Sequence, residues 1–184
     1  MKLFQINITL ILVISILLVG AVGCTSYKHT IKRHHQQTER EREDKRTIQK
    51  IQKELNGDEK KILHEAGEWL GTPYYYGRQD KSVATDCSGF VMQVFNTAID
   101  CKLPRNAAKQ AEYCKHISHR QIKAGDLVFF SIGKDGKISH VGIMIDEKNF
   151  IHASSSKGVV ISSMESNYYK KRFKKYGRVP CMRH

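Results

Sequence analysis

The sequence lacks the patterns expected of a structural metal protein or of a repeat protein. Its 184 residues include five cysteines, yet no two of them form a Cys-x-x-Cys pair, and no segment repeats another. Cys114, His116 and His119 lie close together in the chain, but a zinc site built on them would lack a clear fourth ligand. We therefore expect neither a metal nor a cofactor.

The sequence is also short of acidic residues. Asp and Glu number 18 against 31 Lys and Arg, which gives a formal net charge of +13. The densest basic run is Lys170–Lys175, which in a cytosolic protein would suggest binding to nucleic acid. The N-terminus, however, has the pattern of an export signal, which indicates a location outside the cytosol. We therefore expect no nucleic-acid partner and a solvated basic face with a nonspecific attraction to anionic surfaces.

The first 24 residues have the pattern of an export signal. A short basic start precedes an almost continuous apolar run at residues 8–19, and the small residues 20–23 lead to Cys24. A cysteine directly after such a segment is what a bacterial lipoprotein signal requires, because its thiol is diacylated. We expect a signal peptide at residues 1–23 and a lipid on Cys24. The alternative is an uncleaved membrane anchor, since the apolar run approaches spanning length.

The segment from residue 24 to residue 57 has the composition of a tether. It is polar and highly charged, and only Ile48, Ile51 and Leu55 form a narrow apolar stripe, so it is either a solvated helix or a disordered chain. Thr25, rather than an aspartate, follows the lipidated position, which in many Gram-negative bacteria permits sorting to the outer membrane. We therefore expect a cell-envelope lipoprotein of the outer membrane that faces the periplasm.

Residues 58–184 have the pattern of one compact α+β domain. Residues 62–70 carry the apolar face of a helix that ends at the Gly71-Thr72-Pro73 turn, and Asp86 is a good N-cap for a second apolar helix. Short β-branched or aromatic runs follow at residues 126–130, 140–145, 149–153 and 159–162. Helices first and strands afterwards predict N-terminal helices packed on an antiparallel sheet.

Cys87 and two histidines have the order of a thiol nucleophile followed by its base. Cys87 begins the second predicted helix, where unpaired N–H groups and the helix dipole stabilise a thiolate. His140 begins one predicted strand and His152 ends the next, with Asp146 midway between them in a polar turn. A hairpin centred there would place the imidazoles opposite each other, so that one acts as base while the other orients it. Gly89 would let the helix start pack closely on that sheet.

Six segments in this order resemble the NlpC-type family of cell-wall cysteine peptidases, a branch of the papain-like fold. They are Gly71–Gly77, Asp86–Val91, Leu103–Arg105, Gly125–Phe130, Ser139–Ile143 and Ile151–Ala153, and they extend over essentially all of residues 58–184. One departure is Arg78, where the family usually has a second glycine. Taken alone, a cysteine at a helix start is more often a small buried residue, but the ordered set favours catalysis.

The resemblance implies a catalytic triad. Cys87 would be the nucleophile, His140 the general base and His152 the residue that orients the base. Tyr76 and the backbone N–H of Cys87 would contribute to the oxyanion site.

The resemblance also implies a substrate, the stem peptides of peptidoglycan, cut by a monomeric endopeptidase held at the membrane by its N-terminal lipid. The bond would be γ-D-glutamyl to diamino acid or D-alanyl to diaminopimelyl. Asp86 and Ser88 match positions that in some relatives help to bind the amine end of the stem peptide. Two alternatives stay open: a catalytically silent wall-binding or regulatory lipoprotein, and amidase or acyl-transfer chemistry on the same triad.

The cysteines limit the disulfides. With Cys24 lipidated and Cys87 kept as a thiol, Cys101, Cys114 and Cys181 remain, so at most one disulfide forms. The pair of Cys101 and Cys114 is the most local candidate.

Overall fold

The computed structural model describes residues 7–182, and it describes side chains from residue 30 onward. The chain divides into two compact units, residues 1–40 and residues 41–184. The predicted signal peptide at residues 1–23 and the predicted lipid on Cys24 fall outside the described side chains, so both stay predictions. In the part of the chain that is described, no helix has an apolar stretch long enough to cross a membrane.

The first long helix, α1 (Asn7–Gln52), belongs to both units. In the first unit the side chains of residues 30–37 are exposed, which agrees with the solvated helix that the sequence allowed. In the second unit Ile48 is only 3% exposed and is part of the hydrophobic core, with Ile51 and Leu55 packed against it. This differs from the predicted tether at residues 24–57, because the narrow apolar stripe packs on the domain instead of facing water.

The second unit contains a six-stranded antiparallel sheet with the strand order β3-β8-β4-β5-β6-β7. Its strands are β3 (Lys115–Ile117), β4 (Leu127–Phe130), β5 (His140–Met144), β6 (Asn149–Ser154), β7 (Gly158–Ser163) and β8 (Phe173–Arg178). A separate short pair joins β1 (Gln79–Asp80) to β2 (Ala84–Thr85). The predicted α+β class with an antiparallel sheet is confirmed.

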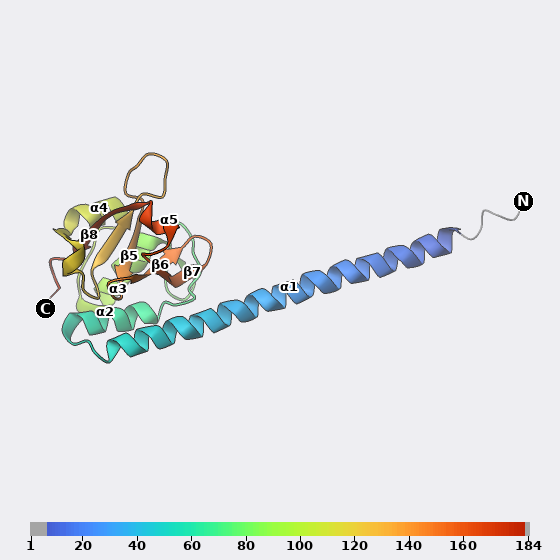
Figure 1. The fold of residues 1–184 in the computed structure, drawn as a ribbon, viewed down its shortest axis with the longest axis horizontal. Coiled ribbons are helices and arrows are strands. Elements are labelled where there is room, and N and C mark those ends of the chain that lie inside the picture. Colours follow the sequence, from blue (N-terminus) through green and yellow to red (C-terminus); the bar gives the residue numbers. More distant parts are fainter. Residues whose placement is uncertain (1–6, 183–184) are drawn as a thin grey trace, which may run out of the picture. The chain divides into compact units, whose positions relative to one another are not determined.

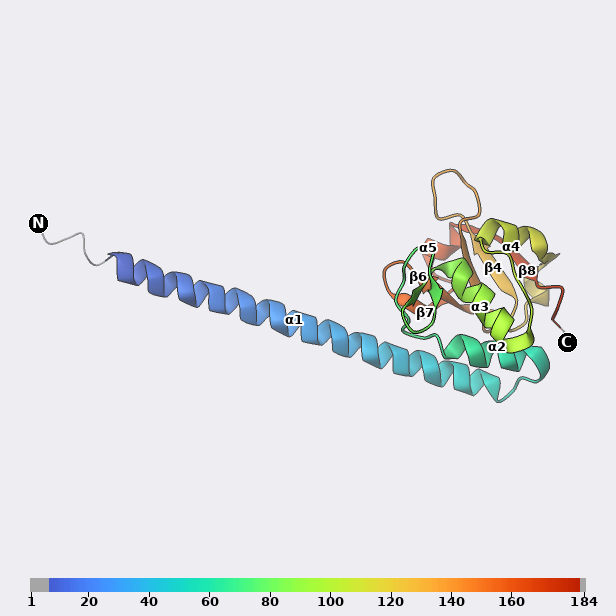
Figure 2. The same cartoon turned by 180° about the vertical axis from the view of Figure 1, so that it is seen from behind.

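The helices of this unit are α2 (Gly57–Gly67), α3 (Cys87–Ile99), α4 (Ala107–Tyr113) and the short α5 (Asn167–Lys170), with a 3-10 turn at His119–Gln121. Helices α2 and α3 lie on one face of the six-stranded sheet, and α5 lies toward its other side (Figures 1 and 2). The sequence placed α2 and α3 correctly. It did not indicate α5, which lies just before the basic run.

The unit has two hydrophobic cores, and helix α3 is the central element of the larger one. Its apolar positions recur at helical spacing, and Phe90, Val91, Val94 and Phe95 are all fully buried. The Trp69 ring meets the Phe90 ring edge-on at 5.8 Å. Removing the Phe90 side chain would therefore cost about 3–5 kcal/mol of stability, the usual range for a large core aromatic.

A second, smaller core lies on the opposite side of the sheet, because side chains alternate between its two faces. It is built from Ile117, Ile122, Val128, Phe130, Met144, Phe150 and Tyr176, with Met164 and Tyr169 packed against it. The ring centroids of Phe130 and Phe150 are 5.2 Å apart. This aromatic side of the sheet is where the two histidines of interest lie.

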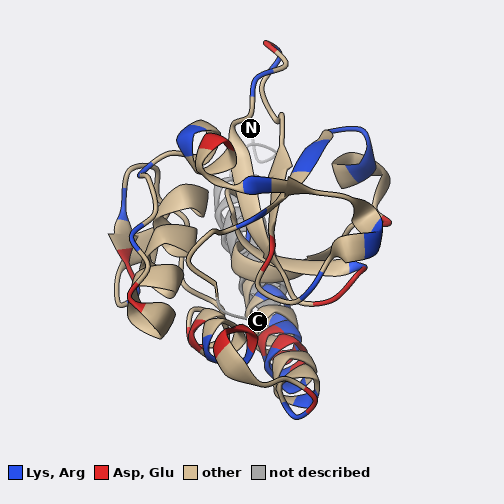
Figure 3. Ribbon diagram, turned by 90° about the vertical axis from the view of Figure 1, so that its left-hand side faces the viewer, with Lys and Arg blue, Asp and Glu red and all other residues tan. Residues whose placement is uncertain are grey.

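The basic run that the sequence assigned to a solvated face keeps Lys170, Lys171 and Lys174 exposed, but its last part lies in the sheet. Phe173, Lys174 and Lys175 begin β8, an internal strand paired with β4 on one side and β3 on the other. The Lys175 ammonium donates to the carbonyl oxygen of Ala111 at 2.9 Å. Figure 3 shows Lys and Arg spread over several elements rather than confined to this run.

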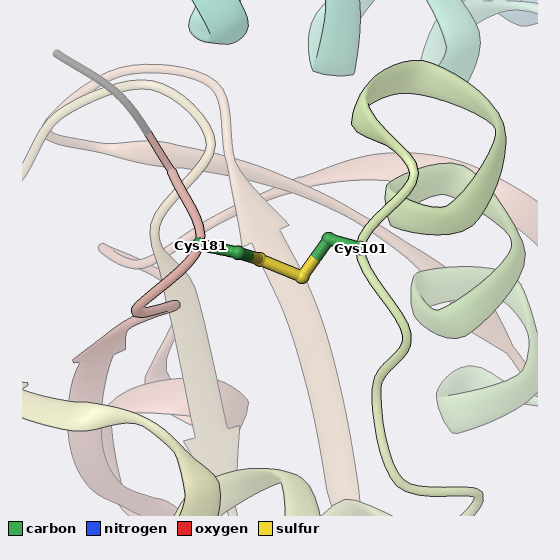
Figure 4. The surroundings of a disulfide bond; sticks show 2 residues. All are labelled: Cys101 and Cys181. Atoms are coloured by element: carbon green, nitrogen blue, oxygen red, sulfur yellow. A yellow bond between two sulfur atoms is a disulfide. The ribbon is translucent and has the colours of Figure 1, made fainter.

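One disulfide is present among the described residues, and it joins Cys101 to Cys181 (Figure 4). The most local candidate, the pair of Cys101 and Cys114, is therefore not the one that forms. Cys114 is buried beside β8, where a Cβ added to Gly177 would lie 2.7 Å from the Cys114 Cβ. That packing holds Cys114 in the core, while the chain after β8 brings Cys181 to Cys101 with their Cα atoms 6.3 Å apart.

We expect the Cys101–Cys181 disulfide to stabilise the fold substantially, because it closes a loop of 80 residues in the unfolded chain. A reductant should lower the free energy of unfolding by about 4 kcal/mol, measured by urea denaturation with and without dithiothreitol. The same reductant should not affect a Cys101→Ser, Cys181→Ser double variant. Equal sensitivity of both proteins to the reductant would contradict the assignment.

Candidate active site

The start of α3 is fixed by Asp86. Its carboxylate accepts the backbone N–H of Gly89 at 2.7 Å as a helix N-cap, and it accepts the backbone N–H of Gly77 at 2.8 Å from the preceding loop. Gly89 is required here, because an added Cβ would lie 2.6 Å from the carbonyl oxygen of Arg78. The close approach is thus to this loop rather than to the sheet that the sequence suggested. Together these contacts place Cys87 at the first turn of the helix.

Arg105 is a partner of Asp86 whose contact the sequence did not reveal. Its guanidinium donates to both carboxylate oxygens, at 2.9 and 2.7 Å, and to the Ser88 hydroxyl at 3.0 Å. Burial opposes ionisation of Asp86, but the hydrogen bonds from Arg105, Gly89 and Gly77 outweigh it and lower the pKa of this carboxyl. Asp86 and Ser88 are therefore already bonded to a cation on the cleft wall.

The two histidines are in direct contact. The Nε2 atom of His140, on β5, lies 2.8 Å from Nδ1 of His152, on β6. Strand pairing sets Ile143 opposite Ile151 and Met144 opposite Phe150, so the register differs by two residues from the one predicted. The imidazoles are diagonal neighbours on one face instead of an opposed pair.

Gly142 allows this contact. A Cβ at this position would lie 2.6 Å from the Phe150 ring, 3.1 Å from the Ile151 carbonyl oxygen and 3.2 Å from the His152 Cβ. Any larger residue would push β6 away from β5. The glycine in the Ser139–Gly142 motif is thus explained by the close approach of β6, first of all by the Phe150 ring and then by Ile151 and His152.

Cys87, in the first turn of α3, lies close to the start of β5. Its sulfur is 3.9 Å from the carbonyl oxygen of Ser139, the residue that precedes His140. Because His140 uses Nε2 for His152, its Nδ1 atom is the ring nitrogen left for the thiol. The structure therefore places His140 against His152 and the Cys87 sulfur next to the residue that precedes His140.

Burial controls the protonation of this site. It raises the pKa of the Cys87 thiol to about 11, against smaller opposing contributions from backbone N–H groups, and it lowers the pKa of His140 to about 4. The sequence predicted a thiolate favoured by the helix start, but desolvation outweighs that effect. At neutral pH both groups are uncharged, so His140 is a free base that can take the thiol proton.

A cleft of about 530 Å³ opens beside Cys87. Its walls include Tyr74, Tyr76, Arg105, Ile138 and Ser139. Tyr76 is 84% exposed, whereas Tyr74 is half-buried and close enough for the charges of Cys87 and Asp86 to add to the effect of burial in raising its pKa. Tyr74, which the sequence left as core or cleft wall, therefore belongs to the cleft wall that also contains Cys87.

The alternative metal set is not assembled. Cys114 is buried, while His116 and His119 are exposed and His119 lies edge-on to the Tyr176 ring. Across the described part of the chain, no group of three or more His, Cys, Asp or Glu residues is placed to hold a metal ion.

Comparison with known proteins gives a consistent result. Residues 71–178 match the model of the NlpC/P60 family. The chain is 37% identical over 164 residues to the Escherichia coli K12 protein named Murein DD-endopeptidase MepS/Murein LD-carboxypeptidase, a match that covers 86% of each chain. It is 43% identical over 112 residues to a Haemophilus influenzae protein named "Probable endopeptidase", covering 61% of this chain and 69% of that one.

Solved structures share the fold as well. A Staphylococcus aureus protein described as similar to lipoprotein, of the NLP/P60 family, superposes with a TM-score of 0.61 at 31% identity. The match covers 66% of this chain and 41% of that one.

The neutral thiol and imidazole predict a distinctive pH dependence of alkylation. In a Cys114→Ala chain, we expect the rate at which iodoacetamide modifies Cys87 to rise roughly tenfold per pH unit from pH 7 to pH 10, because the pKa is raised and the thiolate fraction keeps growing. An imidazolium–thiolate pair would instead give a rate that is already constant across neutral pH. A plateau between pH 5 and pH 9 would therefore contradict the neutral pair. The modified residue is identified by peptide mass spectrometry.

Proposed function

The chain belongs to the NlpC/P60 family, and we propose that it is a cysteine endopeptidase that cleaves the peptides of peptidoglycan. The observation that carries the proposal is the Cys87–His140–His152 arrangement, with a buried neutral base in contact with a second imidazole and a cleft opening at the thiol. The named activities of its relatives support the same substrate class.

The site residues support a two-step acyl transfer. As the Cys87 sulfur attacks the amide carbon, Nδ1 of His140 takes the thiol proton and passes it to the leaving amine, which leaves a thioester on the sulfur. Water then attacks the thioester while His140 takes a proton from it. That proton returns to the sulfur as the carboxyl product departs.

The oxyanion formed in each step needs fixed donors. Cys87 lines the cleft in the first turn of α3, where backbone N–H groups have no acceptor within the helix, so its N–H is one candidate donor and a tyrosine hydroxyl is the second. Tyr76 was the tyrosine implied by the family resemblance. The position of Tyr74 beside Cys87 leads us to propose Tyr74 as the donor and Tyr76 as a residue of the cleft rim.

For the bond, we propose the cross-link between D-alanine and diaminopimelate. The support is the similarity to a named DD-endopeptidase across 86% of both chains. The γ-D-glutamyl bond is the alternative. The salt bridge between Arg105 and Asp86 supports the cross-link, because a carboxylate already bonded to a guanidinium attracts a free peptide amine less strongly.

For the location, we propose an outer-membrane lipoprotein anchored through Cys24, with the catalytic unit in the periplasm acting as a monomer.

Replacing the nucleophile should abolish hydrolysis, and the chain supplies a matched control. Cys87 and Cys114 are both buried unpaired cysteines. Purified Cys87→Ala protein should release no muropeptides from sacculi, while Cys114→Ala should retain at least about half of the wild-type rate, because only Cys87 borders the cleft. Chromatography with mass spectrometry of the products also identifies the bond. Substantial release by Cys87→Ala, with both proteins folded, would reject the peptidase.

The two tyrosines give a second paired test. Loss of an oxyanion donor typically lowers kcat by about 10²–10³-fold, so Tyr74→Phe should be strongly impaired in kcat with little change in KM. Tyr76→Phe should remain within about threefold of wild type. The reverse ranking would return the oxyanion role to Tyr76.

The anchor is tested separately from catalysis. Labelled palmitate should be incorporated into the wild-type chain and not into Cys24→Ala, which should accumulate as a precursor with Met1 retained. Labelling that persists in Cys24→Ala, or wild-type protein found in the cytosol, would contradict the proposed location.

A further inference from the structure

The outer nitrogen of His152 has two hydroxyl partners. Its Nε2 atom lies 3.0 Å from Ser162 Oγ and 3.1 Å from the Tyr169 hydroxyl. Neither residue belongs to a segment that the sequence connected with the site. His152 itself is 1% exposed, so water cannot readily replace either partner.

Two different elements deliver these hydroxyls. Strand pairing places Val160 opposite His152 and Ser162 opposite Phe150, so Ser162 is a diagonal neighbour of His152 on the same face of the sheet. Tyr169 comes from α5, and its ring packs on Phe130 at 5.2 Å and on Phe150 at 4.9 Å. The aromatic core thus orients the Tyr169 ring and directs its hydroxyl at the histidine.

The hydrogen-bond chain has only two consistent proton arrangements while both histidines are neutral. If His140 is to accept the thiol proton at Nδ1, its own proton must lie on Nε2 and point at His152 Nδ1. Nδ1 of His152 must then be bare, which places the His152 proton on Nε2. That N–H is then directed at the Ser162 and Tyr169 oxygens.

The opposite arrangement disables the base. If either hydroxyl donated to His152 Nε2, the His152 proton would move to Nδ1 and would be donated to His140 Nε2. The remaining proton of His140 would then occupy Nδ1 and face Cys87, where it blocks proton transfer. The direction of the hydrogen bonds at one end of the chain therefore sets the state of the base at the other.

We propose that Ser162 and Tyr169 are positioning residues that accept the His152 Nε2–H and thereby hold His140 in the tautomer that can deprotonate Cys87. The inference deepens the proposed peptidase function and rests on it for its kinetic consequences. The two hydroxyl oxygens also face the far end of the chain when His140 becomes an imidazolium. They then stabilise the positive charge that passes partly to His152.

The kinetic test uses the full-length chain and neighbouring residues as controls. Each of Ser162→Ala and Tyr169→Phe should lower kcat on a cross-linked muropeptide about fivefold to tenfold with KM unchanged, and the double variant should lose about fiftyfold or more, since both hydroxyl acceptors are removed. Ser162→Thr should restore most of the loss from Ser162→Ala. The matched controls are Ser163→Ala and Tyr168→Phe, which alter adjacent hydroxyls and should stay near the wild-type rate.

A second readout does not depend on hydrolysis. Nitrogen NMR of histidine-labelled, substrate-free protein should show the proton on Nε2 of both His140 and His152, assigned by the loss of signals in His140→Gln and His152→Gln. The Ser162→Ala, Tyr169→Phe double variant should show the His140 proton shifted to Nδ1 in a substantial fraction. Thermal unfolding checks that each variant is folded.

The outcomes separate the two claims. Wild-type protein that releases no muropeptide would reject the proposed function, and the NMR result would still decide the proton arrangement. A wild-type His140 protonated at Nδ1, or a double variant as active as the Ser163→Ala, Tyr168→Phe control, would overturn the positioning role.

Discussion

The carboxylate of Asp86 is the interaction on which the site depends. It caps α3 through Gly89, holds the preceding loop through Gly77 and forms a two-point ion pair with Arg105. A single side chain therefore fixes the helix start, one wall of the cleft and the segment that leads to α4. Its removal would leave the partly exposed Arg105 guanidinium without this partner and α3 without its cap, so we attribute the precise placement of the thiol to this residue.

The second constraint is the exclusion of water from the histidine pair. His140 and His152 are 6% and 1% exposed. Burial lowers the pKa of His140, so that its neutral imidazole is the stable form, and burial of Cys87 raises the pKa of the thiol. The enclosure has two consequences. It keeps His140 available as a base over a wide pH range, and it makes the direction of each hydrogen bond in the pair important, because no solvent can compensate for a misplaced proton.

Local signals made much of this structure predictable. The Asp86 cap, the apolar spacing of α3 and the four strands from β4 to β7 depend on residues that are close together in the sequence, and the sequence predicted all of them. Contacts between distant segments were not. Cys181 meets Cys101 across 80 residues, Arg105 reaches Asp86 from the next helix connection, and β8 lies inside the sheet although its sequence is mostly basic. In β8 the buried positions are Tyr176 and Gly177, too few for an alternating pattern to be recognised.

The histidine pair shows which part of such a prediction is secure. His140 and His152 are separated by an even number of residues across a hairpin, so they face the same side of the sheet in any register that keeps the parity. The actual register is shifted by two from the predicted one, and the side chains still meet, because diagonal neighbours remain within reach when a glycine lies between them. The even spacing of the two histidines in the sequence therefore determined that they share one face of the sheet. The residue that lies directly opposite His152 in the strand pairing is Gly142, and this register was not evident from the sequence. The hydroxyls of Ser162 and Tyr169 follow from that shifted geometry, which is why only the folded chain reveals them.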